Sequence, residues 1–286
     1  MKNRLFSFLV GCLLATAATA QDNALLYEVT GNGLAKPSYL YGTFHLVCPN
    51  DLMLTDALKK ATADAQQVYL EIDMDDPNLQ SSMMQGMMLT GGKTMKDLMS
   101  TDDYALVDSY LQKKAGMGLA QIGGLKPIAL YSFMMMGALG CQPASYDLTL
   151  MQMATQDKKE ILGLEKLEDQ LALFDKVPME KQTAMLVEMA RNPDDLQKEF
   201  ANLLAAYKAQ DLTSMMRQMK ESKYDGGLED FEADLLDKRN QNWIPVIEKA
   251  AKDKPTLFAF GAGHLGGDKG VIQLLRAKGY TVKGIK

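Results

Sequence analysis

The chain has 286 residues, of which 47% are hydrophobic and 23% are charged, and this composition suits one large domain or one domain with an insertion. A net charge of -5, with no basic stripe carrying interleaved aromatic residues, argues against a nucleic-acid-binding protein. After the first 20 residues, no stretch reaches the ~20 apolar residues that a membrane span needs.

Residues 1–20 are predicted to be a secretory signal peptide. A basic start precedes a mostly apolar run and a small-residue cleavage site, at Lys2, Arg4, Leu5 to Ala15 and Ala18 to Ala20. A retained membrane helix and a lipoprotein signal that ends at Cys12 are the alternatives. We therefore expect an exported protein, periplasmic or extracellular, in which residues 21–286 form a single domain.

The first predicted elements are two strands, over residues 24–30 and 38–41, joined by a glycine-rich turn as in a hairpin. The second strand leads into Gly42 and His45. Thr55 is a predicted N-cap for a helix that ends near residue 66.

A β-rich run that contains Glu71 follows this helix, over residues 68–73. A helix between two strands is typical of a βαβ unit, so the strands on either side of it should be parallel.

Residues from 75 to about 237 are predicted to be a helical insertion, because they are rich in Met, Leu, Ala and Lys. Many of the 21 methionines of the chain lie here. Methionine fills irregular gaps in helical cores and also lines adaptable binding surfaces, so the insertion is either plain core or an apolar cap over the site. A short strand over residues 160–164, followed by Glu165, is predicted within it.

The C-terminal part returns to an α/β pattern. Arg239 lies in a helix predicted over residues 228–240, and Pro245 either kinks this helix or begins a new one. A strand, a helix and a last strand are then predicted over residues 256–260, 270–278 and 280–282.

The two histidines of the chain, His45 and His264, each lie three residues after a glycine at the end of a predicted strand. If these strands are neighbours, both imidazoles converge with Glu71 at one edge of the sheet. Two histidines and one carboxylate are a usual ligand set for a hydrolytic or redox metal. The glycines would permit a positive φ or a close approach of the backbone. The alternative is two surface-turn histidines and a solvent-facing acid.

Cys48 and Cys141 are the cysteines that follow the predicted signal peptide, and export would permit a disulfide between them. We predict this bond, which would tie the loop after His45 to the helical segment. The His45-x-x-Cys48 spacing also suits a metal, but the second pair of a structural zinc site is missing. No Gly-x-Ser-x-Gly segment indicates a serine hydrolase.

Together, several of these segments resemble the TraB/PrgY/GumN family, whose relatives include Tiki-type metalloproteases. The resemblance covers essentially the whole mature chain and rests on Tyr39 to His45, Tyr69 to Asp73, Gly163 to Glu165 with Gln170, Arg239-Asn240, and Phe260 to Gly267. It implies an α/β fold with a mixed central β-sheet built from two similar halves, interrupted here by the Met-rich helical insertion. It also implies that the two histidines and a strand-end glutamate share one site.

The Tiki branch further implies divalent-metal-dependent cleavage of a peptide or protein. On this basis His45, His264 and Glu71 are candidate ligands of Mn²⁺, Co²⁺ or Zn²⁺, and Glu71 is alternatively the general base. Glu165 is a reserve catalytic carboxylate, and Arg239 would stabilise a developing oxyanion. A non-catalytic envelope binding or signalling protein and a metal-independent, esterase-like hydrolase with His45 as base are the alternatives. The substrate, the metal and the oligomeric state stay open.

Overall fold

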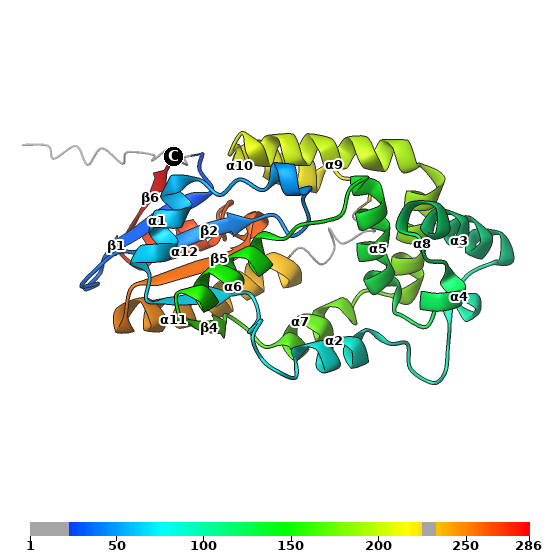
Figure 1. The fold of residues 1–286 in the computed structure, drawn as a ribbon, viewed down its shortest axis with the longest axis horizontal. Coiled ribbons are helices and arrows are strands. Elements are labelled where there is room, and N and C mark those ends of the chain that lie inside the picture. The colour runs from blue at the N-terminus through cyan, green and yellow to red at the C-terminus, as the bar shows by residue number, and fades with distance from the viewer. Residues whose placement is uncertain (1–22, 225–232) are drawn as a thin grey trace, which may run out of the picture.

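The computed structural model describes residues 23–224 and 233–286. Within them a single mixed sheet has the strand order β4-β3-β5-β2-β1-β6. Its strands are β1 (Leu26–Gly31), β2 (Ser38–Thr43), β3 (Gln67–Leu70), β4 (Glu160–Gly163), β5 (Thr256–Gly261) and β6 (Tyr280–Ile285). The predicted α/β class with a mixed sheet is confirmed (Figure 1).

Four neighbouring strands, β4, β3, β5 and β2, run parallel, whereas β1 pairs antiparallel with both β2 and β6. The predicted hairpin is confirmed, with Leu26 of β1 opposite Tyr41 of β2. Strands β2 and β3 are parallel as expected, but β5 lies between them. Because the four parallel strands end at the same edge, the segments that follow them meet there.

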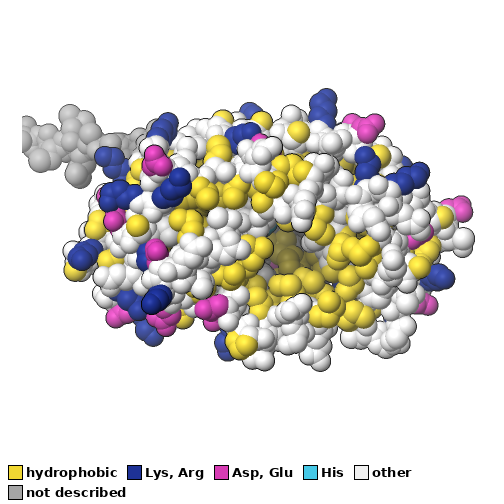
Figure 2. All heavy atoms as spheres, viewed as in Figure 1, with side chains coloured by type: hydrophobic (Ala, Val, Ile, Leu, Met, Phe, Trp, Pro, Cys, Tyr) yellow, Lys and Arg dark blue, Asp and Glu magenta, His cyan; other side chains and the backbone are white. Residues whose placement is uncertain are grey.

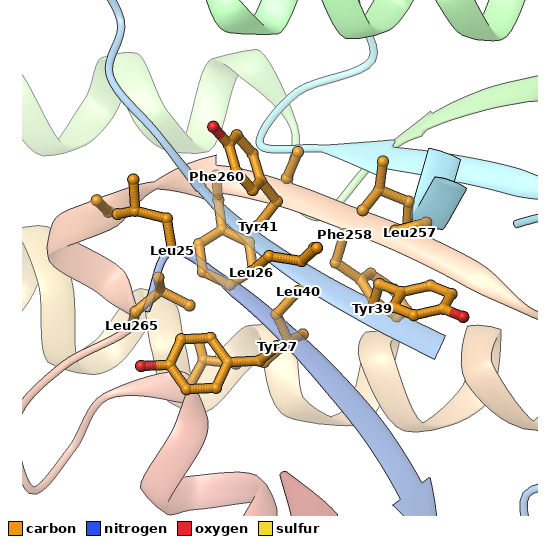
Figure 3. Packing of buried hydrophobic residues seen from close by; sticks show 14 of the residues in the cluster. Leu25, Leu26, Tyr27, Tyr39, Leu40, Tyr41, Leu257, Phe258, Phe260 and Leu265 are labelled. Carbon is orange, nitrogen blue, oxygen red and sulfur yellow. The ribbon is translucent and has the colours of Figure 1, made fainter. Parts of the chain in front are cut away.

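The core of this sheet is built from strands that are almost entirely apolar. Every residue of β2 is buried, and so are the first five of β5, because helices cover these central strands on both faces. Figure 3 shows Leu40 of β2 among the aromatic side chains of Tyr27, Phe258 and Phe260. The helices beside the sheet are α1 (Asp56–Asp64), α6 (Tyr146–Gln156), α11 (Lys238–Asp253) and α12 (Val271–Ala277).

The start of α1 matches the sequence prediction, and the course of α11 settles the role of Pro245. Thr55 caps α1 as predicted, because its hydroxyl accepts a hydrogen bond from the amide of Leu58. Pro245 lies inside α11, which continues to Asp253 without a second start. The predicted helix over residues 228–240 falls partly outside the described residues, and the predicted signal peptide falls wholly outside them.

A second hydrophobic cluster fills the helical lobe beside the sheet, and Val107, Leu111, Leu130 and Leu186 are fully buried in it. The helices of this region are α2 (Leu79–Met87), α3 (Thr101–Ala115), α4 (Leu119–Ile122), α5 (Pro127–Leu139), α7 (Leu167–Phe174), α8 (Met179–Arg191) and α9 (Pro193–Lys208) (Figure 1). The interval predicted as the insertion also contains α6, α10 (Leu212–Lys220) and β4, which pack with the sheet.

The predicted disulfide between Cys48 and Cys141 is confirmed, with a Cα–Cα distance of 5.9 Å. Beside it, Val47 and Ala144 exchange backbone hydrogen bonds of 3.0 and 2.7 Å. These contacts fasten the loop after β2 to the start of α6, and this is the loop that carries His45. No helix in the described part of the chain combines the length and apolar character needed to cross a membrane.

Candidate active site

Each of the four parallel strands is followed by one of the polar residues singled out in the sequence. His45 follows β2, Glu71 comes directly after β3, Glu165 follows β4, and His264 follows β5. Helix α11 adds Arg239 from its first turn. The structure brings all five into one connected group, as the contacts below show.

Glu71 is at the centre of the group. Its Oε1 accepts the backbone N–H of Gly261 at 2.8 Å, and its Oε2 accepts Nη2 of Arg239 at 2.5 Å and Nε2 of Gln170 at 3.0 Å. Burial by itself raises the pKa of this carboxyl, but the electrostatic interactions with His264, His45 and Arg239 and the hydrogen bond from the Gly261 amide outweigh it. Its pKa is lowered to about 2, so Glu71 is ionised at neutral pH.

His264 is a buried, neutral imidazole whose tautomer can be assigned. Its Nδ1 lies 2.7 Å from Oδ1 of Asn240, and Asn240 in turn donates through Nδ2 to the carbonyl of Lys269 at 3.0 Å. Nδ1 therefore carries the proton, and Nε2 has a free lone pair that accepts from Nη1 of Arg239 at 3.1 Å. Burial, opposed by Glu71 but reinforced by Arg239 and His45, lowers its pKa to about 3.

His45 lies in a different setting, with 64% of its side chain exposed to the cleft. Its Nδ1 is 3.2 Å from Oδ2 of Asp147, which also accepts the hydroxyl of Thr43 through Oδ1. Desolvation by the cleft walls lowers the pKa of the ring, but the hydrogen bond to Asp147 and the charges of Glu71 and Asp147 outweigh it. The pKa of His45 is thereby raised to about 9.

Arg239 joins the two glutamates. Its Nε and Nη2 donate to Glu165 over 2.7–3.1 Å, and Nη2 also pairs with Glu71. Trp243 donates its Nε1 to Glu165 at 3.0 Å and lies below the guanidinium, 4.8 Å from ring centroid to Cζ. Only 11% of the Arg239 side chain is exposed, so these contacts direct its charge toward the carboxylates rather than toward open solvent.

The glycines of the two Gly-x-x-His motifs serve close packing. None of Gly42, Gly261 and Gly263 has a positive φ. A Cβ on Gly42 would lie 2.5 Å from a methyl of Leu265, and one on Gly261 would lie 3.2 Å from Nε2 of His45 and 3.3 Å from Oε1 of Glu71. The motif therefore demands glycine because backbone and imidazole approach each other here, and not because the turn is left-handed.

The donor set fits a divalent metal in type and orientation. Oε1 of Glu71 lies 3.8 Å from Nε2 of His45 and 4.0 Å from Nε2 of His264, near the upper limit of roughly 4.0–4.4 Å for two ligands of one ion with ~2.0–2.2 Å bonds, so these donors would have to move closer together to share it. Both Nδ1 atoms face an acceptor, Asp147 or Asn240, which is the second contact that ligating histidines usually make.

The same group is not a ready-made metal site. Within residues 23–224 and 233–286, no group of three or more His, Cys, Asp or Glu side chains is arranged to hold an ion. One obstacle to an ion here is the contact between Nη1 of Arg239 and Nε2 of His264, which occupies the lone pair that an ion would need. A metal could bind all three donors only after this contact is lost.

The sequence interpretation missed Asp147 and Trp243 as parts of the site. Asp147 lies within the segment predicted as the helical insertion, and it is 102 positions from the histidine that it contacts. The cysteine pair was the available signal, because Cys141 lies six residues before Asp147 and is bonded to the loop that carries His45. Trp243 lies one helical turn after Arg239, the spacing at which two side chains share a face.

Comparisons with known proteins support this assembly of motifs. The chain is 26% identical to metalloprotease TIKI2 of Xenopus tropicalis over 86% of this chain and 57% of that protein. It is 24% identical to metalloprotease TIKI1 of Danio rerio and of Homo sapiens, in both cases over 86% of this chain and over 60% and 59% of those proteins. The chain thus spans somewhat more than half the length of these relatives.

No solved structure gives a significant match. The family model of TraB/PrgY/gumN matches residues 25–284, a range that contains both Gly-x-x-His motifs and all of the strands described above except the last residue of β6. The chain therefore belongs to the TraB/PrgY/gumN family.

Proposed function

We propose that the protein is a peptidase-like hydrolase that uses a divalent metal ion held by His45, Glu71 and His264. The observation that carries this proposal is the orientation of the two imidazoles, whose Nε2 atoms approach one oxygen of Glu71 while both Nδ1 atoms are engaged elsewhere. Peptide chemistry is favoured because the relatives described above are metalloproteases. When bound, such an ion polarises a carbonyl and acidifies a water.

The remaining residues of the group position these donors. Asp147 holds the ring of His45, and Asn240 holds His264 in the tautomer whose Nε2 has its lone pair toward Glu71. Glu71 is kept ionised and supplies the shared carboxylate.

Arg239 is proposed to hold Glu71 and Glu165, because its guanidinium is buried between them and not presented to a substrate. This position favours an orienting role over the oxyanion contact expected from the sequence. Glu165 is in turn held by Arg239 and Trp243, so Glu71 is the better candidate for the catalytic carboxylate.

We also propose that the protein is exported and acts in the periplasm or outside the cell. The disulfide supports this, because such bonds persist in oxidising compartments. Export predicts that protein isolated from its native source begins near Gln21, which N-terminal sequencing would show. A chain that retains residues 1–20 and is recovered with the cytoplasm would contradict it.

The decisive assay for the activity is cleavage of a peptide library by the mature protein after chelation, with Mn²⁺, Co²⁺ or Zn²⁺ then added back. The proposal predicts no cleavage after chelation, recovery with at least one of these ions, and no recovery in His45→Ala or His264→Ala. Cleavage that survives chelation but needs His45 would favour the metal-independent hydrolase. Neither cleavage nor bound metal under any condition would favour a binding protein.

A further inference from the structure

A cavity of about 510 Å³ opens beside His45, between the sheet edge and the helical lobe. Figure 2 shows hydrophobic side chains gathered around this hollow. The volume lies within the ~300–1,000 Å³ range of ligand pockets, so it can accept a short apolar segment rather than water alone. His45 belongs both to the wall of this cavity and to the candidate active site.

The wall is apolar and contributed by many separate elements. Side chains from α2, α7, α8, α10 and the turn Ala233–Asp237 line it, including Met87, Leu171, Phe174, Met185, Met216 and Leu236. Methionine side chains are flexible and polarizable, so such a wall adapts to several apolar shapes. Part of the Met-rich sequence therefore lines this cavity and does not lie wholly in the helical core.

Two of the charged side chains in the wall neutralise each other. Lys126 and Asp175 pair at 2.6 Å, and the Lys126 side chain is only 14% exposed. Lys220 and His45 also line the cavity, so a charged ligand group is disfavoured only where the wall is apolar, because there it would lose its hydration without gaining a partner. The apolar part of the cavity therefore favours apolar side chains.

We propose that this cavity is the specificity pocket of the enzyme and binds large apolar side chains of a peptide substrate beside the bond to be cleaved. The proposal rests on the function proposed above and adds a substrate class to it. A peptide is the favoured occupant because His45 makes the cavity continuous with the site of cleavage. Burying one Leu or Phe side chain here should strengthen binding roughly 10- to 100-fold over a small polar residue.

The test measures binding separately from cleavage. Two fluorescein-labelled octapeptides of otherwise identical sequence, one with a central Leu-Phe pair and one with Ser-Asp, are titrated with the protein in the presence of a chelator. Fluorescence anisotropy should give a Kd at least about 10-fold lower for the Leu-Phe peptide. Equal affinity for the two peptides would overturn the proposal.

Two cavity-filling variants localise the effect. Ser132→Trp and Met216→Trp place a large ring at the cavity wall, and each should remove most of the Leu-Phe preference. Met84→Trp is the matched control, because Met84 is on α2, is 59% exposed and does not line the cavity. Unchanged preference in both filling variants would also overturn the proposal, and circular dichroism would verify that each variant is folded.

The two proposals fail in distinguishable ways. Cleavage of peptides without any apolar preference would leave the hydrolase proposal intact and overturn the assignment of the cavity. Apolar-selective binding that is lost in the filling variants, with no cleavage under any metal condition, would uphold the cavity as a binding site and overturn the hydrolase proposal.

Discussion

The loop after β2 and the turn after β5 each carry a histidine three residues beyond a glycine, and each approaches the same oxygen of Glu71. Their surroundings differ in almost every other respect. The side chain of His45 is 64% exposed and has the carboxyl group of Asp147 as its partner, whereas that of His264 is 5% exposed and has the amide of Asn240.

This difference sets opposite chemical states for two residues in the same motif. Negative neighbours raise the pKa of His45 to about 9, and burial lowers the pKa of His264 to about 3. The sequence motif therefore specifies where each ring is placed, and contacts from other elements decide what the ring can do. Nε2 of His264 lies deep in the protein, and the ring of His45 is accessible at the cavity wall.

The largest expected effect comes from removing Glu71, the carboxylate that both histidines approach. Glu71→Ala should lower kcat/KM for peptide cleavage by about 10²–10⁴-fold and abolish metal binding, because it removes the common carboxylate. Glu168→Ala is the matched control, since this acid is exposed at the start of α7. Steady-state kinetics would measure the loss, and an effect of similar size in the control would contradict a specific role for Glu71.

Removing Arg239 should act mainly on stability. Arg239→Ala leaves Glu71 and Glu165 buried without their cation, so the free energy of unfolding should fall by about 3–5 kcal/mol in urea titrations. Lys238→Ala, which removes the neighbouring exposed ion pair with Asp234, should cost only about 0–1 kcal/mol. Equal losses for the two variants would contradict the buried bridge between β3, β4 and α11.

A smaller effect, on metal affinity, is expected from changing the residues that contact the Nδ1 atoms of the two histidines. Asp147→Asn and Asn240→Ala should each lower metal affinity by about 10–100-fold, because the outer contact of a ligating histidine orients it and sets its basicity. Ser145→Ala is a suitable control near Asp147, since its hydroxyl reaches that carboxylate only at 3.4 Å. Unchanged affinity in both partner variants would show that neither ring depends on its second contact.

The smallest expected effects concern the response of the metal-free protein to pH. Its two histidine rings should titrate separately by NMR, with pKa values of about 9 for His45 and about 3 for His264. Between pH 6.5 and about 3 the unfolded chain binds more protons than folded His264 does, so this residue makes the protein less stable as the pH falls. Between 6.5 and about 9 the folded state binds more protons at His45, so its contribution is lost as the pH rises. Equal pKa values for the two rings would contradict the proposed difference between the environments of His45 and His264.

Much of this arrangement was predictable because strand ends carry a local signal. The glycine and histidine spacing identified both rings, and the β-rich run before Glu71 placed it at a third strand end. The insertion of β5 between β2 and β3 was not predictable, because a buried apolar run does not specify its neighbours. Asp147 was missed because it reaches His45 only through the tertiary link made by the disulfide and the neighbouring backbone bridge.

The central claim is that both motifs form one metal site, and metal stoichiometry tests it most directly. Mature protein is dialysed to equilibrium against Mn²⁺, Co²⁺ or Zn²⁺, and bound metal is measured by mass spectrometry in wild type, His45→Ala and His264→Ala. The account predicts about one ion per chain in the wild type and almost none in either variant, because each ring supplies one of only three protein ligands. A full equivalent of metal retained by either folded variant would contradict it.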